Sequence, residues 1–126
     1  MDFNKASGVG IQIHAENAEY IGEFLGNKFE GYGKISYRGG FVYQGEFRGG
    51  GEFGPFGKCI YSDGSYYIGE FKDGVRSGKG ILYCNEYKII GHWRGDRLEG
   101  EAVIQFNRSK GIEKVKFERG KCTQKF

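Results

Sequence analysis

The 126-residue chain lacks several features that would assign it to a common functional class. It has no run of about 18 or more apolar residues, so no membrane-spanning helix is expected. Residues 1–5 (MDFNK) contain no apolar segment, so a secretory signal is not expected either. The three cysteines, Cys59, Cys84 and Cys122, are odd in number and lack CxxC spacing. This argues against a disulfide framework or a zinc site and favours a reducing, intracellular setting.

Catalytic motifs are also missing. Residues 49–54 (GGGEFG) match GxGxxG, but Pro55 follows where a dinucleotide site needs a helix. The sequence contains no GxSxG or Walker pattern. We therefore predict no catalytic, cofactor-binding or metal-binding residues, no cofactor, and a protein that is not an enzyme.

Proline occurs once, whereas glycine contributes 24 residues, far above its usual share of about 7%. Such a composition could indicate a disordered linker. However, nine tyrosines, eleven phenylalanines and one tryptophan argue against disorder, because disordered chains are poor in aromatic residues. Glycine combined with regularly spaced aromatic residues predicts a folded β-structure.

The formal net charge of +3 is unevenly distributed, since residues 102–126 hold seven Lys or Arg and two Glu. This basic C-terminal stretch could contact an anionic lipid surface such as one containing phosphoinositides. Alternatively, its lysines protect a strand edge from pairing with other chains. The residues concerned are Lys110, Lys114, Lys116, Arg119, Lys121 and Lys125.

A five-residue pattern recurs along the chain. Tyr20-Ile21-Gly22-Glu23-Phe24 returns from Tyr43 and from Tyr67, and in degraded form from Ile89 and from Glu113, at intervals of 23, 24, 22 and 24 residues. A period of this length indicates a repeat array. We place a partial repeat at 8–19, repeats at 20–42, 43–66, 67–88 and 89–112, and a degraded half-repeat at 113–126.

Each repeat predicts a β-hairpin. Alternation in the aromatic-x-Gly-x-aromatic segment is typical of a strand, and a second strand begins at a glycine after six more residues. These glycines are Gly31, Gly54, Gly78 and Gly100. The fold is therefore predicted to be all-β, a meander of about ten short antiparallel strands. Whether Tyr83 or Cys84 holds the place of Tyr61 in the third repeat stays open.

Two local features follow from this pattern. One extra residue in Gly54-Pro55-Phe56-Gly57 predicts a β-bulge, where proline is tolerated. If Phe24 lies opposite Gly31 and Phe47 opposite Gly33, each ring can cover a glycine backbone and offset the weakness of glycine in a strand.

The pattern Tyr-x-Gly-x-Phe/Trp, followed by glycine pairs such as Gly31/Gly33 and by turns such as Asp63-Gly64, resembles the MORN repeat (membrane occupation and recognition nexus). The resemblance extends from residue 8 to about residue 120, so residues 1–126 are expected to form one MORN-repeat domain. It implies an elongated, single-layer, twisted antiparallel sheet with one grooved face. It also implies a scaffold or adaptor for protein interactions, in a cytoplasmic setting that includes the cytoskeleton or cilium.

The aromatic side chains should lie on one face of the sheet, which has no second layer to cover them. One interpretation is internal packing; the other is an exposed apolar groove, with hydroxyl groups at its rim, that binds a helix or extended segment of a partner protein. The face lacks interleaved Lys and Arg, so no nucleic acid is expected. The predicted groove residues are Tyr20, Phe24, Tyr37, Tyr43, Phe47, Tyr61, Tyr67, Phe71 and Trp93.

The opposite face carries the recurring Glu23, Glu46 and Glu70, which could suggest a metal or catalytic site. Lys34 and Lys58 fall on the same face, so cross-strand ion pairs are the simpler prediction. Other side chains have plain structural interpretations: His14 replaces an aromatic ring, and Cys59 aligns with Ile35 as a small buried hydrophobe.

Three other functions stay open. The chain could bind a membrane through its basic stretch, regulate a separate enzyme, or form homo-oligomers through the ends of its sheet. His92, Ala102 and Val115 depart from the better repeats, so the C-terminal end is expected to cap the array or to dock onto a partner.

Overall fold

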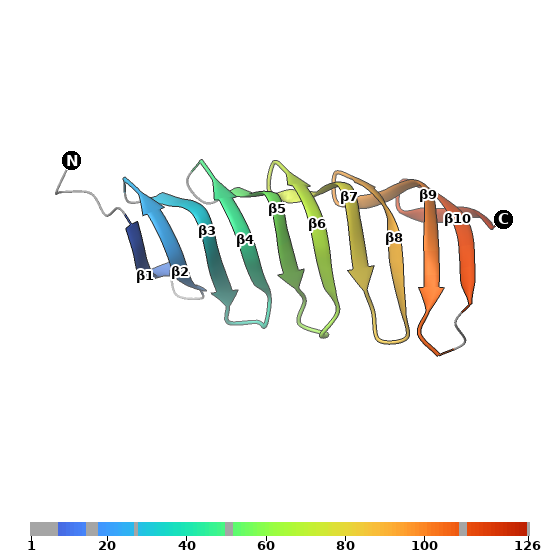
Figure 1. The fold of residues 1–126 in the computed structure, drawn as a ribbon, viewed down its shortest axis with the longest axis horizontal. Helices are drawn as coiled ribbons and strands as arrows, with labels where there is room; N and C mark the ends of the chain where they lie inside the picture. Colours follow the sequence, from blue (N-terminus) through green and yellow to red (C-terminus); the bar gives the residue numbers. More distant parts are fainter. Residues whose placement is uncertain (1–7, 15–17, 27, 50–51, 109–110, 126) are drawn as a thin grey trace.

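A single antiparallel sheet accounts for the architecture (Figure 1). The computed structural model describes residues 8–14, 18–26, 28–49, 52–108 and 111–125. These form eleven strands, whose order in the sheet is their order in the sequence. The strands are β1 (Gly8–His14), β2 (Ala18–Leu25), β3 (Lys28–Tyr37), β4 (Val42–Arg48), β5 (Glu52–Ile60), β6 (Tyr66–Lys72), β7 (Val75–Tyr83), β8 (Tyr87–Arg94), β9 (Arg97–Phe106), β10 (Ile112–Glu118) and β11 (Lys121–Lys125).

The predicted all-β class and antiparallel hairpins are confirmed, with eleven strands rather than about ten. The additional strand is β11, which pairs with β10 after a turn at Arg119 and Gly120. Figure 1 shows the strands as a row, with β1 and β10 near opposite ends. Each strand is therefore hydrogen-bonded only to its neighbours in sequence, as expected for a repeat array.

A line of glycines crosses the middle of the sheet. Gly22 pairs with Gly33, Gly33 with Gly45, and the line continues through Gly57, Gly69 and Gly80 to Gly91. In four of the hairpins the pairing is irregular at or immediately beyond these glycines. There the partner strand carries a glycine with positive φ: Gly31 at 74°, Gly54 at 126°, Gly78 at 69° and Gly100 at 77°. The bulge predicted only near Pro55 therefore recurs, because glycine readily adopts this backbone conformation.

Tyrosine, rather than phenylalanine, covers the glycines. Tyr20, Tyr43 and Tyr67 are fully buried, and a Cβ added to Gly33, Gly57 or Gly80 would overlap the tyrosine ring of that hairpin. The predicted pairing of the phenylalanines was wrong: Phe24 lies opposite Phe29, and Phe47 lies opposite Gly31. The recurring bulge is responsible for the Phe24 pairing, because it shifts the register between β2 and β3 beyond the glycine line. Phe47 faces Gly31 because β3 and β4 pair regularly with Gly33 opposite Gly45.

The rings form a continuous core. Phe29 stacks on Tyr20 with ring centroids 3.8 Å apart, and Phe53 stacks on Tyr43 at 4.0 Å. Phe47 packs edge-on against both tyrosines. Edge-to-face and stacked pairs of this kind stabilise by about 0.5–1.5 kcal/mol beyond their area burial. The core therefore extends across repeats rather than lying within one of them.

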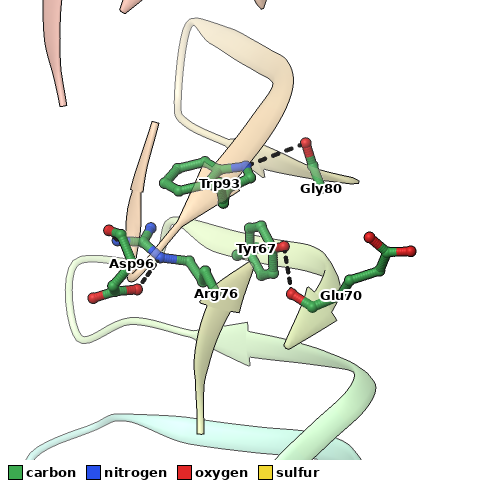
Figure 2. Close-up of polar contacts among 6 residues, drawn as sticks. All are labelled: Tyr67, Glu70, Arg76, Gly80, Trp93 and Asp96. Atoms are coloured by element: carbon green, nitrogen blue, oxygen red, sulfur yellow. Dashed lines mark hydrogen bonds and ion pairs between the residues drawn. The ribbon is translucent and has the colours of Figure 1, made fainter. Parts of the chain in front are cut away.

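The third repeat departs from this pattern, because Arg76 lies opposite Phe71, the place that Phe29 and Phe53 hold in the earlier repeats. Its guanidinium lies 4.3 Å from the centre of the Trp93 ring, and its Nε donates to Asp96 Oδ1 at 2.5 Å (Figure 2). The cation and its carboxylate thus replace one ring of the core.

Two smaller predictions are also decided. Cys59 is 3% exposed and pairs with Tyr43, as Ile35 does, so its interpretation as a buried hydrophobe is confirmed. Cys84 donates its backbone N–H to the Tyr87 carbonyl, as Tyr61 does to the Ser65 carbonyl across its own turn. Cys84, rather than Tyr83, is therefore the equivalent of Tyr61.

Candidate functional site

The predicted aromatic groove is largely filled by its own side chains. Six of its nine residues are buried at the core, and Phe24, Tyr37 and Tyr61 are half-buried. The buried residues are Tyr20, Tyr43, Phe47, Tyr67, Phe71 and Trp93. Partner binding along this face stays a prediction, and the three half-buried rings are the ones with surface to offer.

The expected rim of exposed hydroxyl groups is not formed by the three core tyrosines. Their hydroxyls donate to the backbone carbonyls of Glu23, Glu46 and Glu70 at 2.7, 2.5 and 2.8 Å respectively. Figure 2 shows the Tyr67 bond. Each tyrosine thus satisfies its polar group three residues along its own strand, which lets the whole ring be buried.

Burial also keeps four phenols and one thiol of this face protonated at neutral pH. It raises the pKa of the Tyr20, Tyr43 and Tyr67 hydroxyls above their ordinary value, and it raises the pKa of Tyr61 to about 12. The pKa of the Cys59 thiol is raised to about 12 for the same reason, although the Arg76 charge acts in the opposite direction. These groups hold their protons, so they supply neither a base nor a reactive thiolate.

The recurring carboxylates cap the bulges instead of forming the predicted ion pairs. Glu23 Oε2 accepts the backbone N–H of Tyr32 at 2.6 Å, and Glu70 Oε2 accepts that of Lys79 at 2.6 Å. Each donor immediately follows a bulge glycine. Within the ranges described, the ion pairs are Arg76–Asp96 and Lys116–Glu118. The prediction was wrong because the bulge frees an N–H close to each carboxylate.

In the second repeat the glutamate has no such N–H to accept. Pro55 stands where Tyr32 and Lys79 stand in their repeats, immediately after the bulge glycine, and proline has no N–H to donate. The Glu46 carboxylate accepts the Tyr32 hydroxyl at 3.0 Å instead.

The face predicted to be charged carries a row of aliphatic side chains, one of them exposed and three half-buried. Ile68 pairs with Ile81, Ile81 with Ile90, and Ile90 with Val103, giving one residue from each of β6, β7, β8 and β9. We call these four residues the aliphatic row. Strand alternation places them opposite the aromatic core. Ile90 is 39% exposed and the other three are half-buried, so the described chain covers the row only in part.

The aliphatic row lies in a groove of about 810 Å³. We call it the β6–β9 groove. The backbone of the glycine line lies beside the row, and Phe56, which is 51% exposed, contributes an aromatic ring. The polar lining of the groove comes from Lys79, His92, Glu101 and Lys114. An apolar surface of this kind can bury apolar side chains of another molecule.

Part of this groove was visible in the sequence. Ile21, Ile68 and Ile90 hold the same position of the repeat, between the first residue and the central glycine, and alternation places them on the carboxylate face. The prediction for this face included the recurring glutamates and lysines but not these isoleucines. Ile81 and Val103 hold a second repeat position, three residues after Gly78 and Gly100, and strand pairing brings them beside Ile68 and Ile90.

The basic C-terminal residues do not all lie on one face. Lys114 and Lys116 alternate with the buried Val115 and therefore share the face of the groove, and Arg119 occupies the turn before β11. Lys121 pairs with Glu118, whereas Lys125 pairs with the buried Val115, so these two lysines point to opposite faces. Lys110 lies outside the described residues.

The described part of the chain holds no group of three or more His, Cys, Asp or Glu arranged to bind a metal ion. It also contains no helix long and apolar enough to cross a membrane. His92 is exposed at the groove. The side chain of His14, predicted to replace an aromatic ring, lies outside the description.

Comparison with family models agrees with the fold, since the model of the MORN repeat matches residues 20–42, 67–87 and 90–108. The chain belongs to the MORN-repeat family. MORN repeats are generally modules for protein or membrane interaction and are non-enzymatic. A comparison with curated proteins found no match. The unmatched MORN unit at 43–66 contains the Gly54-Pro55 bulge with its extra residue.

Proposed function

We propose that this MORN array is a non-catalytic adaptor whose β6–β9 groove binds an apolar segment of a partner protein. The observation that carries the proposal is the aliphatic row, which crosses four strands and lies open in a groove of about 810 Å³. Contiguous exposed apolar surface of this kind marks interaction sites. The predicted binding face thus moves to the side opposite the aromatic core.

The two faces differ in the surface that they can offer. Burying exposed apolar area contributes roughly 25 cal/mol per Å², so a partner gains most where side chains are still open. The central tyrosines are 0% exposed and can give almost nothing, whereas Phe56 and Ile90 are 51% and 39% exposed. A rigid sheet beneath the groove also limits the entropy lost on binding.

The proposal is tested by selecting peptides from a random library displayed on phage. The unmodified protein should enrich peptides rich in apolar residues. Ile81→Asp should weaken the selected peptides by about tenfold or more, because the charge loses its water when the groove is filled. Ile21→Asp is the matched control, because Ile21 lies on the same face but outside the groove, on β2.

The outcome is decisive if both variants remain folded, which circular dichroism and thermal unfolding report. Equal binding of the selected peptides to the unmodified protein and to Ile81→Asp would refute the groove as the binding site. Binding of anionic vesicles through the basic stretch stays a prediction, and the spread of those lysines over both faces does not favour it.

A further inference from the structure

We infer that the occupant of the β6–β9 groove is an amphipathic α-helix whose apolar stripe is flanked by acidic residues. This inference rests on the proposed function and adds the conformation and charge of the partner segment. Backbone pairing, the dimensions of the groove and the charges around it support it independently.

Backbone pairing argues for a helix. Strands β6, β7, β8 and β9 are each paired on both sides, so their N–H and C=O groups are already used within the sheet. An extended segment over this groove could not join the sheet, as peptides do at an open edge. A segment held by side chains alone must satisfy its own backbone, and an α-helix does so.

The dimensions suit a helix of about four turns. Neighbouring strands lie about 4.8 Å apart, so the aliphatic row spans roughly 14 Å from β6 to β9. Continuing the row by one strand at each end reaches Lys58 on β5 and Lys114 on β10. These two lysines are then roughly 24 Å apart, a length that a helix covers in about 16 residues.

The charge around the row is predominantly positive. Four lysines surround it, two at the ends and two beside it: Lys58, Lys114, Lys79 and Lys88. None of them takes part in an ion pair within the described residues. Electrostatic complementarity therefore favours an acidic partner.

Two of these lysines are held beside a pair of rings. Tyr66 and Tyr83 are stacked at 4.6 Å, with Lys58 Nζ 4.6 Å from the centre of the Tyr66 ring and Lys88 Nζ 5.7 Å from that of Tyr83. Such contacts position a cation while leaving its remaining donors available.

The acidic groups near the groove do not cancel this charge. The face carries three carboxylates close to the row, those of Glu70, Glu99 and Glu101. Glu70 already accepts the Lys79 backbone N–H at 2.6 Å, and Glu99 accepts that of Arg119 at 3.2 Å. Glu101 lies opposite Lys116. The four lysines therefore exceed the carboxylates beside them.

Three synthetic peptides test the inference. Each has 18 residues, acetylated and amidated ends, a fluorescent label and the same leucine stripe at helical spacing. Only the flanking residues differ, being Glu, Gln or Lys. In fluorescence anisotropy the Glu peptide should bind about tenfold more tightly than the Lys peptide at low salt, and the preference should shrink in 0.5 M NaCl. Circular dichroism should report helix formation on binding.

Charge-reversed variants locate the effect. The double variant Lys58→Glu and Lys114→Glu should remove or invert the preference for the Glu peptide. The matched control is Lys34→Glu with Lys121→Glu, which changes the net charge equally at lysines that do not adjoin the aliphatic row, since Lys34 pairs with Gln44 and Lys121 with Glu118. The two double variants are compared in 0.15 M NaCl, where the Debye length is about 8 Å, and there the control should alter the preference by less than about threefold.

The outcomes separate the two proposals. If all three peptides bind equally and Ile81→Asp abolishes their binding, the groove stands and the acidic partner is refuted. Tighter binding of the Lys peptide, or binding without helix formation, also refutes the inference. If no peptide binds, or if Ile81→Asp leaves binding unchanged, both the inference and the proposed function fail.

Discussion

The two faces of this sheet are built from the same strands, yet one is closed and the other is open. On the aromatic face a tyrosine extends along its own strand, lies over a glycine pair and bonds to a carbonyl three residues away. On the other face, isoleucine and valine lie side by side across the strands and are buried only in part. This single-layer sheet thus has its hydrophobic core on the aromatic face, where the rings lie over the glycine backbone.

The difference implies a division of tasks between the faces. Changes on the aromatic face should alter stability, whereas changes on the aliphatic face should alter binding with little effect on stability. The following predictions test this division, beginning with the largest expected effect.

Tyr43→Ala should destabilise the protein by about 3–5 kcal/mol, since it removes a fully buried ring that stacks on Phe53 and a hydroxyl that bonds to Glu46. Thermal unfolding followed by circular dichroism should show a Tm lower by roughly 10 °C or more. Ile81→Ala, on the open face, should lower stability by about 1 kcal/mol or less. Equal losses in the two variants would contradict the division.

Alkaline pH should destabilise the protein through the aromatic face. Burial raises the pKa of Tyr67 and brings that of Tyr61 to about 12, so the native state holds these protons more tightly than the unfolded chain does. The protonated phenols therefore contribute fully to the free energy of unfolding at pH values below about 10, the tyrosine pKa of the unfolded chain. This contribution is lost as the pH rises towards 12. Urea unfolding at a series of pH values measures it.

Tyr67→Phe provides the control for that titration. This substitution removes one hydroxyl whose pKa is raised in the folded state, so stability should fall less steeply between about pH 10 and pH 12. An unchanged slope would show that Tyr67 does not contribute to the alkaline transition.

Gly80→Ala should destabilise the protein by about 1–3 kcal/mol, because the added methyl group would overlap the Tyr67 ring. Gly39→Ala is the matched control, because nothing lies within 4 Å of the added atom there. Urea unfolding compares the two variants. Similar stabilities would mean that the rings do not depend on the glycine line.

Glu70→Ala should lower the free energy of unfolding by about 1 kcal/mol, from loss of the bond to the Lys79 N–H. Glu46→Ala should lower the free energy of unfolding by less, because Pro55 has no backbone N–H to donate to the Glu46 carboxylate. That carboxylate accepts a hydrogen bond from the exposed Tyr32 hydroxyl instead. Both values come from urea unfolding, and a larger loss for Glu46→Ala would contradict the capping role.

The repeat period and its glycines were enough to predict the hairpins, the antiparallel sheet and the burial of Cys59. Pairing beyond the glycine line could not be predicted, because a bulge requires only a glycine and any of several could supply it. The bulge then decides that Phe24 faces Phe29 and that Glu23 finds an N–H. Sequence position alone does not reveal these partners.

The candidate site was less predictable than the fold. The spacing of the aromatic residues correctly placed them on one face, but their burial depends on how far each ring reaches along its strand. The aliphatic row joins residues of four strands, and two of its members share no repeat position with the others. Arg76 was not singled out either, because its contacts with Trp93 and Asp96 arise only on folding.

The agreement between strand order and sequence order has a mechanical consequence. Tension applied through β1 and β11 acts on the two outermost strands, each of which is held by a single neighbour. Such a sheet yields by peeling strands from its edges one after another, while the strands between remain paired. Extension would then proceed in hairpin-sized steps, and the aliphatic groove at β6–β9 would be released only after the outer strands on at least one side had been drawn out.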